Sequence, residues 1–110
     1  MNGVQLEGLT LHVKDLEKSV EFYSRIPGAK KKMHFPGKFA MFQMGEGRLG
    51  LLQAEKQGFH VELGTGKKLD EMYEAVLAAG FRPESPPTDR PWGRRDFILL
   101  DPDGNMLEFD

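Results

Sequence analysis

The sequence predicts an α+β fold: two tandem βαβββ modules, at about residues 1–55 and 56–110, whose curved mixed sheets pair around a concave cleft. Three observations predict it. Each half has an apolar strand followed by an amphipathic helix and three strand-like runs. The helices end at two glycines, Gly28 and Gly80, about fifty residues apart. Gly47 and Gly104 precede the last strand of each half. Such modules cannot cover both sheet faces alone, so we expect them to pair and to leave a ligand cleft.

The composition is that of an ordinary globular protein of one domain. The chain has 110 residues, is 39% hydrophobic and carries a net charge of -2. A pI near 5.9 argues against nucleic acid as a partner. With no cysteine, the chain has no disulfide and no Cys-based metal site. The N-terminus does not resemble a signal peptide, and no apolar run is long enough to span a membrane, so we expect a cytoplasmic protein without membrane contact.

The first half of the sequence predicts a strand, a helix and three further strands. Residues 9–13 are apolar and partly β-branched, as in a strand. Asp15 is placed to cap the following helix, whose apolar stripe comprises Leu16, Val20 and Tyr23, widened by Phe22. Pro27-Gly28 ends the helix. Strands are predicted at residues 30–35, 39–44 and 49–53, and the lysines at positions 30–32 suit a solvated sheet edge.

The second half repeats this order. Residues 59–63 predict a strand, and Gly64-Thr65-Gly66 leads into a helix. Its apolar residues follow helical spacing at Leu69, Met72, Tyr73, Val76 and Leu77. Gly80 stands at the usual C-terminal capping position. Phe81-Arg82 is predicted to begin a short strand before a proline-rich loop, and strands follow at residues 97–100 and 106–109.

The last two strands predict a hairpin that presents a single carboxylate. Asp101-Pro102-Asp103-Gly104 suits a type I turn between them. If Leu107 and Phe109 fill the core behind the sheet, Glu108 faces the cleft. A carboxylate there needs a partner, because burying an uncompensated charge is costly. We expect His60 or an arginine to provide it.

Two motifs resemble those of the vicinal oxygen chelate superfamily, which includes glyoxalase I, extradiol dioxygenases, and bleomycin and fosfomycin resistance proteins. The first motif is Asp15-Leu16-Glu17-Lys18-Ser19-Val20-Glu21-Phe22-Tyr23. The second runs from Pro91-Trp92-Gly93 to Asp101-Pro102-Asp103-Gly104-Asn105-Met106-Leu107-Glu108. The resemblance covers nearly the whole chain, is closest to the bleomycin-resistance-type branch, and implies paired βαβββ modules. Because this superfamily includes several chemistries and metal-free binders, the resemblance implies no single activity.

The resemblance also implies where a metal would bind, since metal-binding members place ligands on the first and last strands of each module. Counted from the glycines of the repeat, these four corners fall at Gly8, Leu51, His60 and Glu108. Only His60 and Glu108 have metal-binding side chains, so the implied site is incomplete. A shift of one residue in the second module would put Val61 in the place of His60.

His12 is the candidate for a third ligand, which would give a two-histidine, one-carboxylate site like that of extradiol dioxygenases. Its strand face is right, because residues 8, 10 and 12 share one face. Its position along the strand does not fit, because His12 lies four residues from the corner at Gly8. Four strand residues span roughly 13 Å, whereas a metal–nitrogen bond measures about 2 Å. Only a strand slip or a bulge would bring it to the metal. We therefore expect His12 to contact a ligand instead.

Five further side chains complete the predicted ligand site. Alternation along the strands of residues 30–35 and 39–44 leaves one face for the cleft, where Met33, Phe39 and Met41 would suit a flat apolar ligand. Trp92 and Arg94 are similar to the loop that edges the ligand site in resistance-type relatives. The alternatives are core packing for the first three residues and a proline-pinned surface loop for the last two.

We therefore weigh three functions. The first is a metal-free small-molecule-binding protein, a homodimer that takes an apolar or aromatic ligand at His12, Met33, Phe39, Met41, Trp92, Arg94 and Glu108. The second is a metal-dependent lyase or dioxygenase of the glyoxalase type, with Fe, Mn, Ni or Zn bound by His60 and Glu108. The third is an interaction module with a filled cleft. The sequence identifies no catalytic residue and names no ligand.

Overall fold

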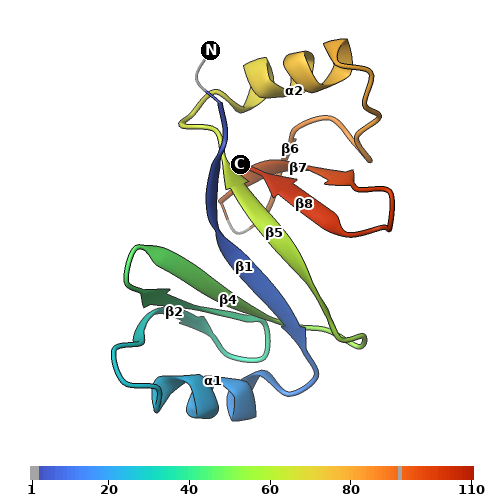
Figure 1. The fold of residues 1–110 in the computed structure, drawn as a ribbon. Coiled ribbons are helices and arrows are strands. Elements are labelled where there is room, and N and C mark those ends of the chain that lie inside the picture. Colours follow the sequence, from blue (N-terminus) through green and yellow to red (C-terminus); the bar gives the residue numbers. More distant parts are fainter. Residues whose placement is uncertain (1–2, 92) are drawn as a thin grey trace. The chain divides into compact units, whose positions relative to one another are not determined.

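The computed structural model describes residues 3–91 and 93–110 and contains two βαβββ repeats, as predicted (Figure 1). The first repeat consists of β1 (Gln5–Val13), α1 (Leu16–Ser24), β2 (Lys30–Phe35), β3 (Phe39–Met44) and β4 (Gly47–Gln53). The second consists of β5 (Gly58–Gly64), α2 (Leu69–Ala78), β6 (Thr88–Asp89), β7 (Arg95–Leu100) and β8 (Met106–Phe109). Strand order is the same in both repeats, β2-β3-β4-β1 and β6-β7-β8-β5. The predicted α+β class is confirmed.

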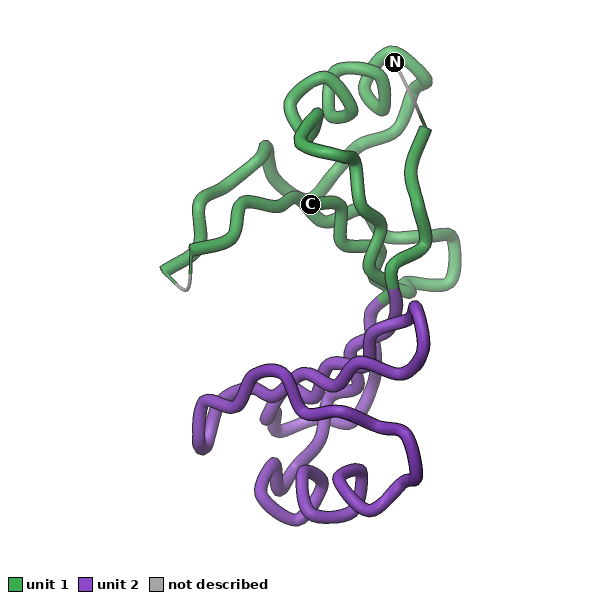
Figure 2. Tube along the Cα trace, turned by 90° about the vertical axis from the view of Figure 1, so that its left-hand side faces the viewer, with its two compact units in different colours: residues 1–7, 61–110 green, residues 8–60 purple. Residues whose placement is uncertain are grey.

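The chain divides into two compact units, which Figure 2 distinguishes by colour. Unit 1 comprises residues 1–7 and 61–110, and unit 2 comprises residues 8–60. Strands β1 and β5 each contribute residues to both units. The prediction of a single domain with a module boundary near residue 55 stays a prediction.

In unit 2, α1 covers one face of the sheet. Its buried residues Leu16 and Val20 pack with Ala40, Phe42 and Leu51 of β3 and β4. Helix α1 begins where predicted, because the Asp15 side chain accepts a hydrogen bond of 3.1 Å from the Lys18 backbone N–H. Phe22 is 54% exposed, so its assignment to the apolar stripe was wrong; the packed face of so short a helix is narrower than expected.

In unit 1, α2 covers the sheet in the same way. Leu69, Met72 and Val76 pack on a core of aromatic and aliphatic residues from β7 and β8: Phe97, Leu99 and Phe109. The Phe97 and Phe109 rings stack with their centroids 4.6 Å apart, which suits their pairing in register across β7 and β8. Gly80 follows the helix with φ +96°, a conformation that glycine adopts without strain.

The proline-rich segment differs from the prediction. Phe81-Arg82 is not a strand, and the short β6 begins only at Thr88. Pro83, Pro86 and Pro87 lack the N–H that a ladder needs, so pairing with β7 starts after the last of them. The hairpin turn is as predicted: the Gly104 N–H donates to the Asp101 carbonyl at 2.9 Å.

Two further observations concern the surface. Lys30, Lys31 and Lys32 are exposed on β2, which is the outermost strand in the order of unit 2, as expected for a solvated sheet edge. Neither helix of the described residues is long and apolar enough to cross a membrane.

Gly8 provides a test of the strand packing. It pairs with Arg48 across β1 and β4, and an added Cβ would overlap the Arg48 carbonyl. We expect Gly8→Ala to lower the free energy of unfolding by about 1–3 kcal/mol, because backbone must move to relieve the overlap. Gly3→Ala is the matched control, since an added Cβ there meets nothing within 4 Å. Equal urea-denaturation curves for the two variants would contradict the close approach.

Candidate functional site

The sheet of unit 2 has one face that α1 does not cover. Residues of β1, β3 and β4 alternate between the two faces, and the core takes Leu11, Ala40, Phe42, Leu49 and Leu51. Their strand neighbours therefore point to the opposite face. This open face carries a different set of side chains, which the cross-strand register places in rows.

Two rows of the open face follow from that register. One row pairs Met33 with Met41, Met41 with Gly50, and Gly50 with Thr10. The next row runs through Phe35, Phe39, Leu52 and His12. Met33 and Phe35 are 42% and 51% exposed, while Phe39 and Met41 are half-buried. The structure thus brings together three of the predicted ligand residues and sets His12 at the end of an apolar row.

Gly50 shapes the middle of this face. An added Cβ there would lie 3.2 Å from Cε1 of Phe39 and would overlap the hydroxyl of Thr10. Only a residue without a side chain lets Phe39 and Thr10 lie over β4 from its two sides. Gly50, which the sequence analysis did not single out, is therefore part of the face.

His12 and His60 meet beside this face, both within unit 2. His12 Nε2 lies 3.0 Å from His60 Nδ1, so one ring donates an N–H to the other. Burial and the neighbouring His60 lower the pKa of His12. The sequence argument concerned the distance from His12 to the metal corner at Gly8, and it did not predict this contact with His60.

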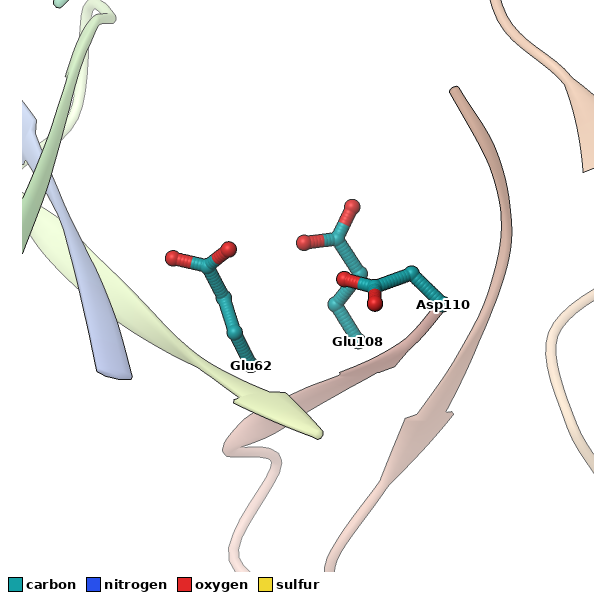
Figure 3. A group of neighbouring side chains, drawn as sticks. All are labelled: Glu62, Glu108 and Asp110. Carbon is teal, nitrogen blue, oxygen red and sulfur yellow. The ribbon is translucent and has the colours of Figure 1, made fainter. Parts of the chain in front are cut away.

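Unit 1 has a different kind of open face, which is acidic. Figure 3 shows Glu62 of β5 with Glu108 and Asp110, which follow each other at alternate positions at the end of the chain. One carboxylate oxygen from each lies within 4.8 Å of the others. Leu107 and Phe109 pack on the α2 side, so Glu108 faces away from that core, as predicted.

Two arginines neutralise part of this acidic face. Arg94 forms an ion pair with Asp110, and its NH2 nitrogen lies 3.9 Å from Glu62. Arg90 donates to Asp96 at 2.9 Å, and the Asp96 side chain is buried. The expectation of an arginine near Glu108 is met by Arg94. Burial acts to lower the pKa of Arg94, but the charges of Asp110, Glu108 and Glu62 together raise it.

Carboxyl groups on this face also bond to one another. Burial, with a hydrogen bond to Glu108, raises the pKa of Asp96 to about 6 despite Arg90. Burial, with Glu7 and Glu108 nearby, raises the pKa of Asp110 to about 6 despite Arg94. Two carboxyl groups form a hydrogen bond only when one holds a proton, so this cluster retains protons at a pH where exposed carboxyl groups are ionised.

The family's four metal corners do not fit a complete ligand set. Gly8 offers no ligand side chain, and the Arg48 carbonyl occupies the place of any side chain there. Leu51 is wholly buried in the α1 core, so its placement on the open face was wrong; its neighbours Gly50 and Leu52 lie on that face instead. In unit 1, a cation among the three carboxylates would have to displace Arg94 from Asp110. The residues at the four corners therefore do not form a complete metal site.

The predicted site residues thus fall into two groups. His12, Met33, Phe39, Met41 and His60 belong to unit 2, and Arg94 and Glu108 belong to unit 1. Trp92 lies outside the described residues. The sequence analysis missed Glu62, Asp96 and Asp110. Alternation along the chain could have indicated two of them. Glu62 lies two residues after His60, and Asp110 lies two residues after Glu108.

Comparisons with known proteins agree with the observed repeat. The sequence pattern of the "Glyoxalase/Bleomycin resistance protein/Dioxygenase superfamily" matches residues 5–109. A "Bleomycin resistance protein" of Geobacillus stearothermophilus is 28% identical, over 90% of each chain. A structure titled as an NAD-dependent benzaldehyde dehydrogenase from Legionella pneumophila is 28% identical, with a TM-score of 0.78 over 93% of this chain and 95% of that one. A hypothetical protein from Bacillus halodurans C-125, 18% identical, shares the fold with a TM-score of 0.80 over 98% and 94% of the chains.

The protonated carboxyl cluster predicts a pH dependence of stability. The native chain binds more protons than the unfolded chain between the ordinary pKa of Asp96, 3.8, and its raised pKa of about 6. The stabilising contribution of Asp96 is thus complete below the lower value and lost as pH rises through the higher one. We expect the stability of Asp96→Asn relative to wild type to increase by about 1–2 kcal/mol from about pH 4 to about pH 7.

Urea denaturation at several pH values measures this difference. Asp103→Asn is the control, because Asp103 is exposed in the hairpin turn. A stability difference between wild type and Asp96→Asn that stays constant with pH would contradict the raised pKa.

Proposed function

Because the chain belongs to the glyoxalase/bleomycin resistance protein/dioxygenase superfamily, we propose that it binds a small apolar or aromatic molecule on the open face of unit 2 and needs no metal to do so. The superfamily name covers enzymes and resistance proteins, so the choice between binding and catalysis depends on the site. Met33, Phe35, Phe39 and Met41 on one uncovered sheet face are the observation that carries the proposal.

These side chains suit a flat apolar ligand. Exposed contiguous apolar surface marks a binding site more often than an ordinary surface does. Aromatic rings offer stacking contacts, and flexible methionine side chains adapt to the outline of a ligand. The cross-strand register places the four residues as two neighbouring pairs, Met33 beside Met41 and Phe35 beside Phe39. A ligand that covers both pairs would remove all four side chains from water.

The absence of two ligand side chains at the family's metal corners supports binding without a metal. Gly8 and Leu51 stand at two of those corners, and relatives named for bleomycin resistance are among those that match. That Arg94 and Glu108 contact the ligand stays a prediction from the sequence. A cytoplasmic homodimer remains part of the proposal; a light-scattering mass equal to one chain would contradict the dimer.

A metal-dependent lyase or dioxygenase is the second candidate function, in which His60 and Glu108 would be ligands. The observation that favours it is the approach of Glu62, Glu108 and Asp110 to within 4.8 Å of one another. Carboxylate oxygens are common ligands of divalent ions. Arg94 weighs against it, because its guanidinium already neutralises Asp110.

Thermal unfolding with added metal tests this second candidate. A metal that binds only the native state raises the unfolding midpoint by mass action. We expect Fe(II), Mn(II), Ni(II) and Zn(II) to raise the midpoint of wild type no more than that of a His60→Ala, Glu108→Ala double variant. A larger shift for wild type with any of these metals, or stoichiometric metal in freshly purified protein, would favour the enzyme over the metal-free binder.

Fluorescence titration with the neutral aromatic probe N-phenylnaphthylamine, in EDTA, tests the proposed binding face. We expect saturable binding, and we expect Phe39→Ala and Met41→Ala each to raise the Kd about tenfold, because each removes apolar contact area from the face. Phe22→Ala is the matched control, since Phe22 is an exposed aromatic residue on α1, which lies on the other side of the sheet. No saturable binding, or equal weakening by all three variants, would contradict the proposal.

A further inference from the structure

Each unit has a pair of phenylalanines in register on neighbouring strands, but the two pairs differ in ring contact. In unit 1, Phe97 and Phe109 pair across β7 and β8, and their rings stack with centroids 4.6 Å apart. In unit 2, Phe35 and Phe39 pair across β2 and β3. In the described part of the chain, neither of these two rings contacts another aromatic ring. Register alone therefore does not place Phe39.

Gly50 accounts for the position of Phe39. Phe39 pairs with Leu52, so Gly50 is its diagonal neighbour on the same face of β4. Diagonal neighbours lie about 7–8 Å apart, so a ring standing upright on β3 would not come close to Gly50. Cε1 of Phe39 nevertheless lies 3.2 Å from the place that a Cβ of residue 50 would take. The ring therefore leans across β4 and covers Gly50.

Thr10 approaches the same glycine from the other side. Thr10 pairs with Gly50 across β1 and β4, and its hydroxyl overlaps the place of a Cβ of residue 50. Thr10 is only 2% exposed, although its strand position is on the open face. Two side chains thus converge on the backbone of Gly50. The missing side chain at residue 50 is what allows Phe39 to lie low on the sheet.

A phenylalanine that lies low on a sheet presents the length of its side chain, rather than its tip, to a ligand above it. Phe39 is half-buried, so part of its surface is accessible. Aromatic rings gain from offset stacking with another ring beyond the burial of apolar area. A planar aromatic ligand can make this contact. A puckered saturated ring cannot, because it has no π system.

We propose that the open face of unit 2 selects planar aromatic ring systems over saturated ones of the same skeleton by stacking on Phe39, and that Gly50 determines this selectivity. The inference rests on the proposed binding function and adds to it the class of ligand. Gly50 acts through Phe39 and is therefore a positioning residue. Met33 and Met41 add flexible apolar contacts that suit either kind of ring.

Calorimetric titration with two neutral probes tests the inference. Naphthalenemethanol is planar, and trans-decahydronaphthalenemethanol carries the same substituent on the same carbon skeleton in saturated form. Burial of apolar area alone predicts that the saturated probe binds at least as tightly, because its extra hydrogen atoms enlarge its apolar surface. We expect wild type to bind the planar probe about three- to tenfold more tightly, because stacking adds to burial.

Variants assign the selectivity to the two residues. Phe39→Leu keeps an apolar side chain without an aromatic ring, and Gly50→Ala places a Cβ against Phe39 and Thr10. We expect each to lower the preference to about twofold or less by weakening binding of the planar probe. Gly47→Ala is the matched control, because its Cβ, on the same strand, would make an ordinary contact with the Met44 carbonyl at 3.7 Å. This control should keep the wild-type preference.

The preference is a ratio of two affinities of one variant, so a general loss of stability does not change it. If Gly50→Ala does not fold, its combination with Thr10→Ala removes the overlap with the Thr10 hydroxyl and takes its place. Equal affinities of wild type for the two probes, tighter binding of the saturated probe, or a preference that survives either Phe39→Leu or Gly50→Ala would overturn this inference and leave the proposed function standing. Binding of neither probe would overturn both.

Discussion

Each repeat of this chain supplies one helix to a sheet with two faces, so only one face of each sheet can be buried by its own repeat. Because successive side chains of a strand point to opposite faces, neighbouring residues have different roles. In β3, Ala40 and Phe42 enter the core, and Phe39 and Met41 are left for the other side. In β8, Phe109 enters the core and Glu108 is left outside it. Candidate function is therefore confined to the residues that the helices do not cover.

The two uncovered faces have diverged although the strand order behind them is the same. In unit 2 the face is apolar and its charges are basic, with Gly50 leaving room for Phe39 and Thr10. In unit 1 the corresponding face gathers carboxylates that need arginines and retained protons to be tolerated. The first arrangement leaves apolar surface for a ligand. The second satisfies most of its own charges, which is why we assign the ligand to unit 2.

Much of the fold could be predicted from the sequence, because it depends on local signals. The Asp15 cap, the stripe from Leu69 to Val76 and the turn before Gly104 each act over a few residues, and the structure confirms them. The open face was also predictable in part, since alternation alone groups Met33, Phe39 and Met41. Contacts between distant strands were not predictable. Counting placed Leu51 on the wrong face, and it gave no indication that His12 would contact His60 or that Arg94 would pair with Asp110.

The most direct test is to observe methionine methyl groups by NMR while naphthalenemethanol is added in the presence of EDTA. Met33 and Met41 lie on the open face of unit 2, Met44 packs toward α1, and Met72 lies in the core of unit 1. Binding to the open face without a metal predicts saturable shifts of the Met33 and Met41 signals, with Met44 and Met72 nearly unchanged. Unchanged Met33 and Met41 signals, or shifts that require an added metal, would contradict it.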